Sequence, residues 1–513
     1  GRYRDALGAT PPPGLPAAFL EPVAGALESL LRRWARTHAP FVAAEVAARW
    51  GLPTAAVEGT LGRLVAHGDL VAGTFRRGGG EGREYGHPEV LRTLRRRSLA
   101  ALRREAEPVA PVALARFLSA WHGVEAPAGG GAPLARPTAS DRLLECVTAL
   151  QGLPLPASVL ERDVLRARVP GYRPALLDEL VAMGEVVWVG RGPLGPGDGR
   201  VALYLRAEAA RLVPEPQEPA PGELQARIRD HLARRGASFF PDLYVAAGGD
   251  PEAVLEALWD LVWAGEVTND TFAPLRLVGA PSRRAVPPRR PLPQRVPPRA
   301  VGRWSLVRDL LEPRATPTER LYAQAGVLLQ RHGVLVREAV VAEGWSGGFA
   351  ALYPVLRAME EAGRARRGYF VAGLGGAQFA LPGAVDRLRS CREADGRVLA
   401  LAATDPANPY GATLPWPEHE AGARPARAAG AYLVVESGEP RLYLERGGRS
   451  LWTWGEVRVE HLRALVAVAG AGARLEVQRV DGVAVRASPL APVLAESGFG
   501  HSPRGMVAWP RTA

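Results

Sequence analysis

The stretch FVAAEVAARWGLPTAAVEGTLGRLVAHGDLVAGTF, residues 41–75, decides the fold of the N-terminal part of the chain. Its first ten residues are expected to form a short helix that ends at Gly51. Pro53 suits the first turn of a second helix, along which apolar residues recur every three or four positions. Gly68 suits the left-handed position that follows a helix, and the last six residues predict a strand.

The sequence on either side completes a recognisable arrangement. Upstream, residues 23–34 carry apolar side chains at helical spacing, so they predict the first of three helices. Downstream, a glycine- and arginine-rich loop over 76–83 leads to a return strand near Glu84 and Tyr85. Three helices followed by a β-hairpin are typical of a winged helix-turn-helix.

The same helix ending occurs four times along the chain. In each case an amphipathic helix runs into a glycine and then into an extended segment, and these glycines are Gly68, Gly184, Gly265 and Gly363. The spacing between them varies, whereas a solenoid keeps a constant period, so we expect separate modules. From about residue 397 short apolar runs alternate with amphipathic stretches, which predicts a domain of another kind.

We therefore predict an α+β fold class, with tandem winged-helix modules followed by a C-terminal β-barrel-like α+β domain. The Arg/Pro-rich linker of this prediction holds seven arginines, seven prolines and no acid, so it cannot bury a core. The expected division is module 1 with flanking helices over 1–123, a linker over 124–140, module 2 over 141–213, module 3 over 214–280, the Arg/Pro-rich linker over 281–303, module 4 over 304–392 and the C-terminal domain over 393–513.

Composition and charge exclude several classes of protein. The 513 residues include 64 basic and 53 acidic ones, for a formal net charge of +11, and every basic residue is an arginine. Without lysine the chain has neither the lysine of a phosphate-binding ATPase loop nor that of a kinase. The histidines and cysteines show no metal-ligand spacing, and no apolar run approaches the length of a membrane span. We expect a cytoplasmic protein without a metal site or a membrane partner.

Clusters of arginine are the candidate DNA contacts, because the guanidinium group binds phosphate through two parallel hydrogen bonds. Arginine beside aromatic rings, as near Tyr369 and Phe370, also suits stacking with single-stranded bases. Each cluster has an alternative interpretation as a solvated face or spacer, and modules 2 and 3 also suit protein–protein contact. The candidates are Arg63, Arg76, Arg77, Arg83, Arg92, Arg95, Arg96, Arg97, Arg283, Arg284, Arg289, Arg290, Arg364, Arg366 and Arg367.

One polar loop, residues 405–411, stands out in the C-terminal domain because Asp405, Asn408 and Tyr410 lie close together in it. It either binds a ligand or forms a structural turn. No arrangement of carboxylates, of serine with histidine, or of glycines identifies a reaction.

Several longer stretches resemble a known family. They include QGLPLPASVLERD at 151–163, GYRPALLDEL at 171–180 and ATDPANPYG at 403–411. These stretches resemble the C-terminal portion of the bacterial large helicase-related protein (Lhr) of the actinobacterial type. The resemblance implies tandem winged helices followed by a β-barrel-like module.

The resemblance also implies a parent protein that is an ATP-dependent, 3′-to-5′ superfamily 2 DNA helicase linked to DNA repair. ATP and Mg²⁺ would bind a motor that precedes residue 1, and this chain would hold no cofactor of its own. The implied partners are single-stranded DNA or duplex DNA with a single-stranded tail, the helicase core, and further copies of the chain in a homo-oligomer.

Two other functions stay open at this point. Part of the family resembles the AlkZ type of DNA glycosylase, which acts on damaged bases, and Gln378 and Asp386 are nearby polar candidates for such catalysis. The catalytic residues are otherwise unknown. A winged-helix transcriptional regulator is the third hypothesis.

Overall fold

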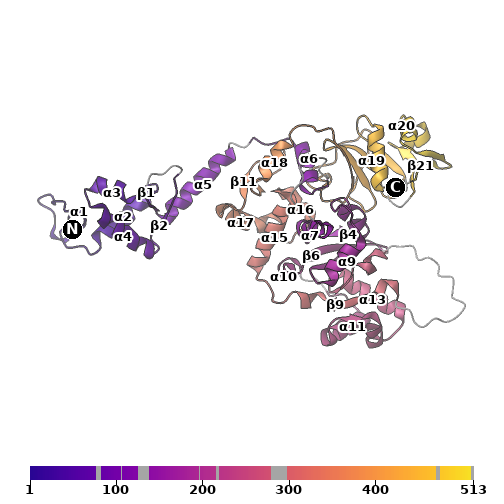
Figure 1. The fold of residues 1–513 in the computed structure, drawn as a ribbon, viewed down its shortest axis with the longest axis horizontal. Helices are drawn as coiled ribbons and strands as arrows, with labels where there is room; N and C mark the ends of the chain where they lie inside the picture. Colours follow the sequence, from indigo (N-terminus) through magenta and orange to yellow (C-terminus); the bar gives the residue numbers. More distant parts are fainter. Residues whose placement is uncertain are drawn as a thin grey trace. The chain divides into compact units, whose positions relative to one another are not determined.

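The computed structural model describes residues 1–76, 82–104, 107–124, 138–195, 197–214, 219–278, 297–469 and 474–509 (Figure 1). The chain divides into two compact units, residues 1–106 and residues 107–513. We describe each unit by itself.

The first unit contains the winged helix that residues 41–75 predict. Its three strands pair in the order β1-β3-β2, so the return strand lies in the middle of the sheet. Leu31, Val46, Val57 and Leu61 form the core beneath that sheet. The elements are α1 (Arg2–Leu7), α2 (Ala26–Thr37), β1 (Phe41–Val42), α3 (Ala43–Trp50), α4 (Thr54–Ala66), β2 (Val71–Gly73), β3 (Glu84–Gly86) and α5 (Pro88–Arg104).

The second unit repeats this sheet three times, each with the strand order first-third-second. Module 2 comprises α7 (Ala139–Leu150), β4 (Leu155–Pro156), α8 (Ala157–Val159), a π-helical segment (Leu160–Leu165), α9 (Pro174–Ala182), β5 (Val186–Pro193), β6 (Gly199–Leu205) and α10 (Ala209–Leu212). Module 3 comprises α11 (Glu223–Arg235), β7 (Ser238–Phe239), α12 (Phe240–Ala247), α13 (Pro251–Trp263), β8 (Val267–Asn269), α14 (Ala273–Arg276) and β9 (Arg303–Leu306). Module 4 comprises α15 (Pro317–His332), β10 (Val334–Leu335), α16 (Arg337–Glu343), α17 (Gly348–Glu361), β11 (Arg366–Gly368), β12 (Gln378–Ala380) and α18 (Ala384–Ser390).

The structure places two module boundaries differently from the sequence-based division. Strand β9 pairs with both β7 and β8, so module 3 ends after residue 303 and the Arg/Pro-rich segment lies between two elements of one module. Helix α6 (Pro111–Trp121), which we assigned to module 1, packs in a core with Leu328 and Leu352 of module 4. Apolar spacing identifies such elements but does not indicate which core receives them.

The C-terminal strands form a six-stranded sheet in the order β13-β14-β15-β16-β18-β19 and a three-stranded sheet in the order β17-β21-β20. We expected a barrel-like domain, and the described strands pair in a linear order. Helix α19 (Val459–Ala469) packs on β13 and β14. The elements are β13 (Val398–Ala402), β14 (Tyr432–Glu436), β15 (Glu439–Leu444), β16 (Ser450–Thr453), β17 (Leu475–Val477), β18 (Arg479–Val480), β19 (Val483–Ala484), α20 (Ala491–Glu496), β20 (Gly500–Ser502) and β21 (Gly505–Ala508).

The six-stranded sheet contributes to two cores at once. Side chains of a strand alternate between its two faces. In β14, Tyr432 and Val434 belong to the core shared with modules 2 and 3, whereas Leu433 and Val435 belong to the core of module 4. The sheet therefore joins modules that the sequence analysis treated as separate. The α+β class with tandem winged helices is confirmed.

No helix in the described part of the chain has the length and apolar character needed to cross a bilayer.

Candidate nucleic-acid interface and cavity

Helix α5 carries the largest set of unpaired candidate arginines. Arg92, Arg95, Arg96 and Arg97 are all exposed, and none has an ion-pair partner among the described residues. Arg92 and Arg96 are four residues apart, so they lie on the same face of the helix. The structure therefore brings together, on one element, cationic groups that are open to a phosphate backbone.

The other candidates of the first unit are mostly engaged within the protein. Arg63 donates to Glu28 at 2.8 Å. Arg76 donates to the buried Glu84 at 2.7 Å and to Glu45 at 3.1 Å, and its hydrogen bond lowers the pKa of the Glu84 carboxyl. Arg83 is exposed. Arg76 thus neutralises acids inside its own module, which local sequence could not reveal because Glu45 lies 31 residues away.

Candidates in two other segments lie outside the described residues. They are Arg77, which belongs to the loop predicted over residues 76–83, and the Arg/Pro-rich positions Arg283, Arg284, Arg289 and Arg290.

Module 4 combines arginine with tyrosine on its surface. The Arg364 guanidinium lies 5.9 Å from the centre of the Tyr322 ring and donates to the Tyr322 hydroxyl. Arg367 donates to the Tyr353 hydroxyl at 2.7 Å, and Arg366 is exposed. The pairing of Tyr322 with Arg364 could not be recognised from sequence, because Tyr322 lies 42 residues before Arg364, on α15.

The two glycosylase candidates do not form a site together. The Gln378 side chain is fully buried and its amide oxygen accepts from the backbone N–H groups of Phe370 and Val371, at 2.7 and 2.9 Å. Its amide nitrogen donates to the carbonyl of Val371 at 2.9 Å. Asp386 is exposed on α18, 3.8 Å from Arg389. Gln378 therefore orders the backbone between β11 and β12, and Asp386 faces solvent.

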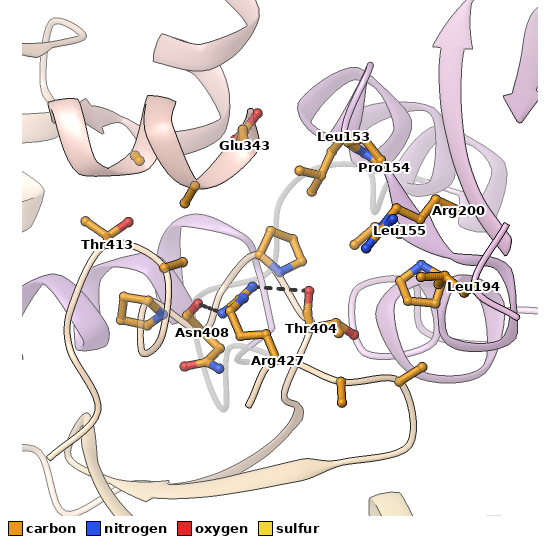
Figure 2. Close-up of a pocket in the computed structure, with 18 of the residues that line it drawn as sticks. Leu153, Pro154, Leu155, Leu194, Arg200, Glu343, Thr404, Asn408, Thr413 and Arg427 are labelled. Atoms are coloured by element: carbon orange, nitrogen blue, oxygen red, sulfur yellow. Dashed lines mark hydrogen bonds between the residues drawn. The ribbon is translucent and has the colours of Figure 1, made fainter. Parts of the chain in front are cut away.

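A cavity of about 470 Å³ lies where modules 2 and 4 meet the C-terminal domain (Figure 2). Flat apolar groups, among them Pro154, Pro156, Pro406 and Pro409, line parts of it. Arg200 and Arg446 add positive charge to the lining. The cavity cannot be recognised from sequence alone, because its walls come from segments that span Leu153 to Arg446.

The polar loop 405–411 forms one wall of the cavity and is held by Arg427. Figure 2 shows Arg427 directed into this loop, where its guanidinium donates to the carbonyls of Asn408 at 2.6 Å and Asp405 at 3.0 Å. Asn408 itself accepts from the Tyr410 N–H at 3.0 Å. These contacts support the interpretation as a structural turn, and the turn shapes a cavity.

Glu343 anchors the opposite wall. It accepts hydrogen bonds from Arg331, from His332 at 2.6 Å and from Trp345 at 2.9 Å. Burial alone would raise the pKa of the Glu343 carboxyl, but Arg331 and His332 outweigh it and hold the pKa well below the ordinary value of 4.5. Arg331 also donates to the carbonyl of Ala149, so this network ties module 4 to module 2.

A second buried ion pair, between Arg168 and Asp405, holds the loop 405–411 in place. Arg168 donates to both carboxylate oxygens of Asp405, at 2.7 and 2.9 Å, and both side chains are almost fully buried. His122 lies near Arg168, and burial together with that charge lowers the pKa of His122 well below its ordinary value. His122 is therefore neutral near pH 7.

Among the residues that the structure describes, no three His, Cys, Asp or Glu side chains gather in a group that suits a metal ion. The cavity lining offers carboxylates, guanidinium groups, the imidazole of His332, the hydroxyls of Thr404 and Thr413, and apolar walls.

The fold and these surfaces define a tandem winged-helix protein, and comparison with known proteins agrees. Two winged-helix domain profiles of the large helicase-related protein match residues 109–206 and 314–399. The chain is 40% identical over 99% of its length to the "Lhr helicase/ probable uracil glycosylase" of Mycolicibacterium smegmatis, and 38% identical over 98% of its length to the "Lhr helicase/uracil glycosylase" of Escherichia coli.

The chain belongs to the Lhr family, as its resemblance indicated. It spans 35% of the length of each of these two relatives. Among solved structures it is similar to the DNA glycosylase AlkZ of Streptomyces sahachiroi, with a TM-score of 0.45 and 14% identity over 73% of this chain and all of that one.

Proposed function

We propose that this chain is the non-ATPase, DNA-binding C-terminal region of an Lhr-type helicase that acts in DNA repair. The observation that carries the proposal is the set of four exposed arginines on α5 that lack an ion-pair partner among the described residues. Each would neutralise one phosphate of single-stranded DNA or of a duplex with a single-stranded tail. The surface arginines of module 4 add positions for stacked bases. ATP and Mg²⁺ belong, in this proposal, to a helicase core outside this chain.

Replacing Arg92, Arg95, Arg96 and Arg97 together by glutamine tests DNA binding. Each phosphate contact adds about 0.9 to the slope of log K against log salt for duplex DNA, so we expect the slope to become shallower by about 3 to 4. Fluorescence anisotropy of labelled tailed DNA over a salt titration measures it.

The matched control replaces four arginines that are paired to acids, namely Arg142, Arg211, Arg227 and Arg303. We expect the control to keep most of the slope. Equal slopes for the two quadruple variants would remove α5 from the DNA path.

A second candidate function, excision of a damaged base, is favoured by the cavity. Its volume of about 470 Å³ and its proline walls suit a nucleotide turned out of the stack, which an enzyme must extract before it can reach the glycosidic bond. Both Lhr relatives carry uracil glycosylase in their names, which supports uracil as the base. Release of uracil from DNA by the purified chain, read as alkali-sensitive strand breaks, tests this function.

We further propose that copies of the chain assemble into a homo-oligomer, as the family resemblance implies. Light scattering across a dilution series distinguishes such an assembly from a monomer.

A further inference from the structure

Two acidic side chains line the cavity, and they have different surroundings. Glu343 is surrounded by Arg331, His332 and Trp345, so its charge is already balanced. Asp198 has no ion-pair partner among the described residues. Its charge is therefore available to whatever occupies the cavity.

Ser158 of helix α8 and the wing of module 2 together hold the Asp198 carboxylate in a fixed position. One oxygen accepts from the Ser158 hydroxyl at 2.5 Å, and the other accepts from the backbone N–H groups of Gly199 at 2.9 Å and Ser158 at 3.2 Å. The Asp198 carbonyl in turn accepts from the Leu194 N–H at 2.8 Å, which closes the turn of the wing. All three donors to the side chain are neutral, so they orient the carboxylate without cancelling its charge.

The charged residues of the cavity suit the charges that develop on the sugar and on the base when a glycosidic bond breaks. Breaking the bond between a base and its sugar develops positive charge on the sugar, which a fixed carboxylate stabilises. The base leaves with negative charge, which the guanidinium groups of Arg200 and Arg446 attract.

We propose that Asp198 is the catalytic carboxylate for hydrolysis of the N-glycosidic bond of a deoxyuridine held in this cavity, an inference that rests on the proposed base excision. The bond between C1′ and N1 breaks, and its electron pair leaves with uracil. The oxygen of a water molecule forms the new bond to C1′ and gives its proton to Asp198, which passes it to the uracil anion. The products are uracil and an abasic sugar.

The test compares Asp198→Asn with Asp309→Asn, an exposed aspartate outside the cavity lining. Single-turnover release of uracil from a labelled strand gives the rate, anisotropy on DNA with an abasic-site analogue gives affinity, and thermal melting gives stability. Loss of a general base or a charge stabiliser costs about 100-fold or more in rate. We expect that loss in Asp198→Asn at unchanged affinity, and parental behaviour in Asp309→Asn.

An Asp198→Asn rate within about threefold of the parent overturns the assignment while base excision stands. Absence of uracil release by the parent chain overturns base excision itself, and the inference with it. If Asp198→Asn melts below the parent, Asp198→Glu takes its place, since it keeps the charge but moves the carboxylate by one methylene group. A lower rate at parental affinity then supports the assignment, and an unchanged rate contradicts it.

Discussion

Replacing Glu343 by alanine is expected to lower the free energy of unfolding by about 3 to 5 kcal/mol, because it leaves the charge of Arg331 buried without a partner. Arg331 is fully buried and also donates to the carbonyls of Ala149 and Gln151, so its guanidinium cannot turn toward solvent. Urea denaturation measures the loss. Glu361→Ala, a surface position 3.6 Å from Arg357, serves as the control and should change the value by less than about 1 kcal/mol.

The ionisation of Glu343 should also make the free energy of unfolding depend on pH. The folded-state pKa of Glu343 lies below its ordinary value of 4.5, so its contribution is fully present above that value and is lost as the pH falls toward the folded-state pKa. The parent should therefore lose stability below about pH 5 more steeply than Glu343→Ala. Parallel pH profiles for the two chains would contradict the role given to Glu343.

Separating Arg168 from Asp405 is the second large effect that we expect. Asp405→Asn keeps the shape of the side chain but removes its charge, which leaves Arg168 unbalanced in a buried place and should cost about 3 to 5 kcal/mol. The Asp405 carboxylate also accepts from the Ala407 N–H at 2.7 Å, so the turn that walls the cavity should loosen.

A double variant separates loss of the pair from loss of packing. Replacing a buried ion pair by apolar residues of similar volume is often neutral, so Arg168→Met with Asp405→Leu should recover most of the stability that Asp405→Asn loses. Urea denaturation of the single and double variants checks this. A double variant less stable than Asp405→Asn would show that the pair's hydrogen bonds, rather than its buried charge, hold the turn.

Much of the fold could be predicted from local patterns. Helical spacing followed by glycine located all four winged helices, because that pattern is local in the sequence. Strand β9 was assigned to the wrong module because more than thirty residues separate it from β8. The residues of β14 do not reveal in sequence that the two faces of this strand meet two different cores.

Sequence alone could identify only those candidate residues that lie close together along the chain. The arginines of α5 follow one another along one helix, so sequence alone marked them. Tertiary contacts pair Arg76 with Glu45 and bury Gln378. Arg76 is therefore not a free cation for DNA, and Gln378 is not open to a substrate. The cavity combines residues from Leu153 to Arg446, so no single stretch carries its signal.

The most direct test of this account blocks the cavity and measures uracil release. Ala342 lines the cavity from an exposed position on α16, and its neighbour Val341 is exposed but outside the lining. Ala342→Phe should fill the space that an extruded base needs, whereas Val341→Phe adds an aromatic ring to the same helix without entering that space. We predict that the parent and Val341→Phe release uracil at similar rates, and that Ala342→Phe binds DNA normally but releases at least about 100-fold less. Equal release by Ala342→Phe and the parent would show that the cavity is not where the base is received.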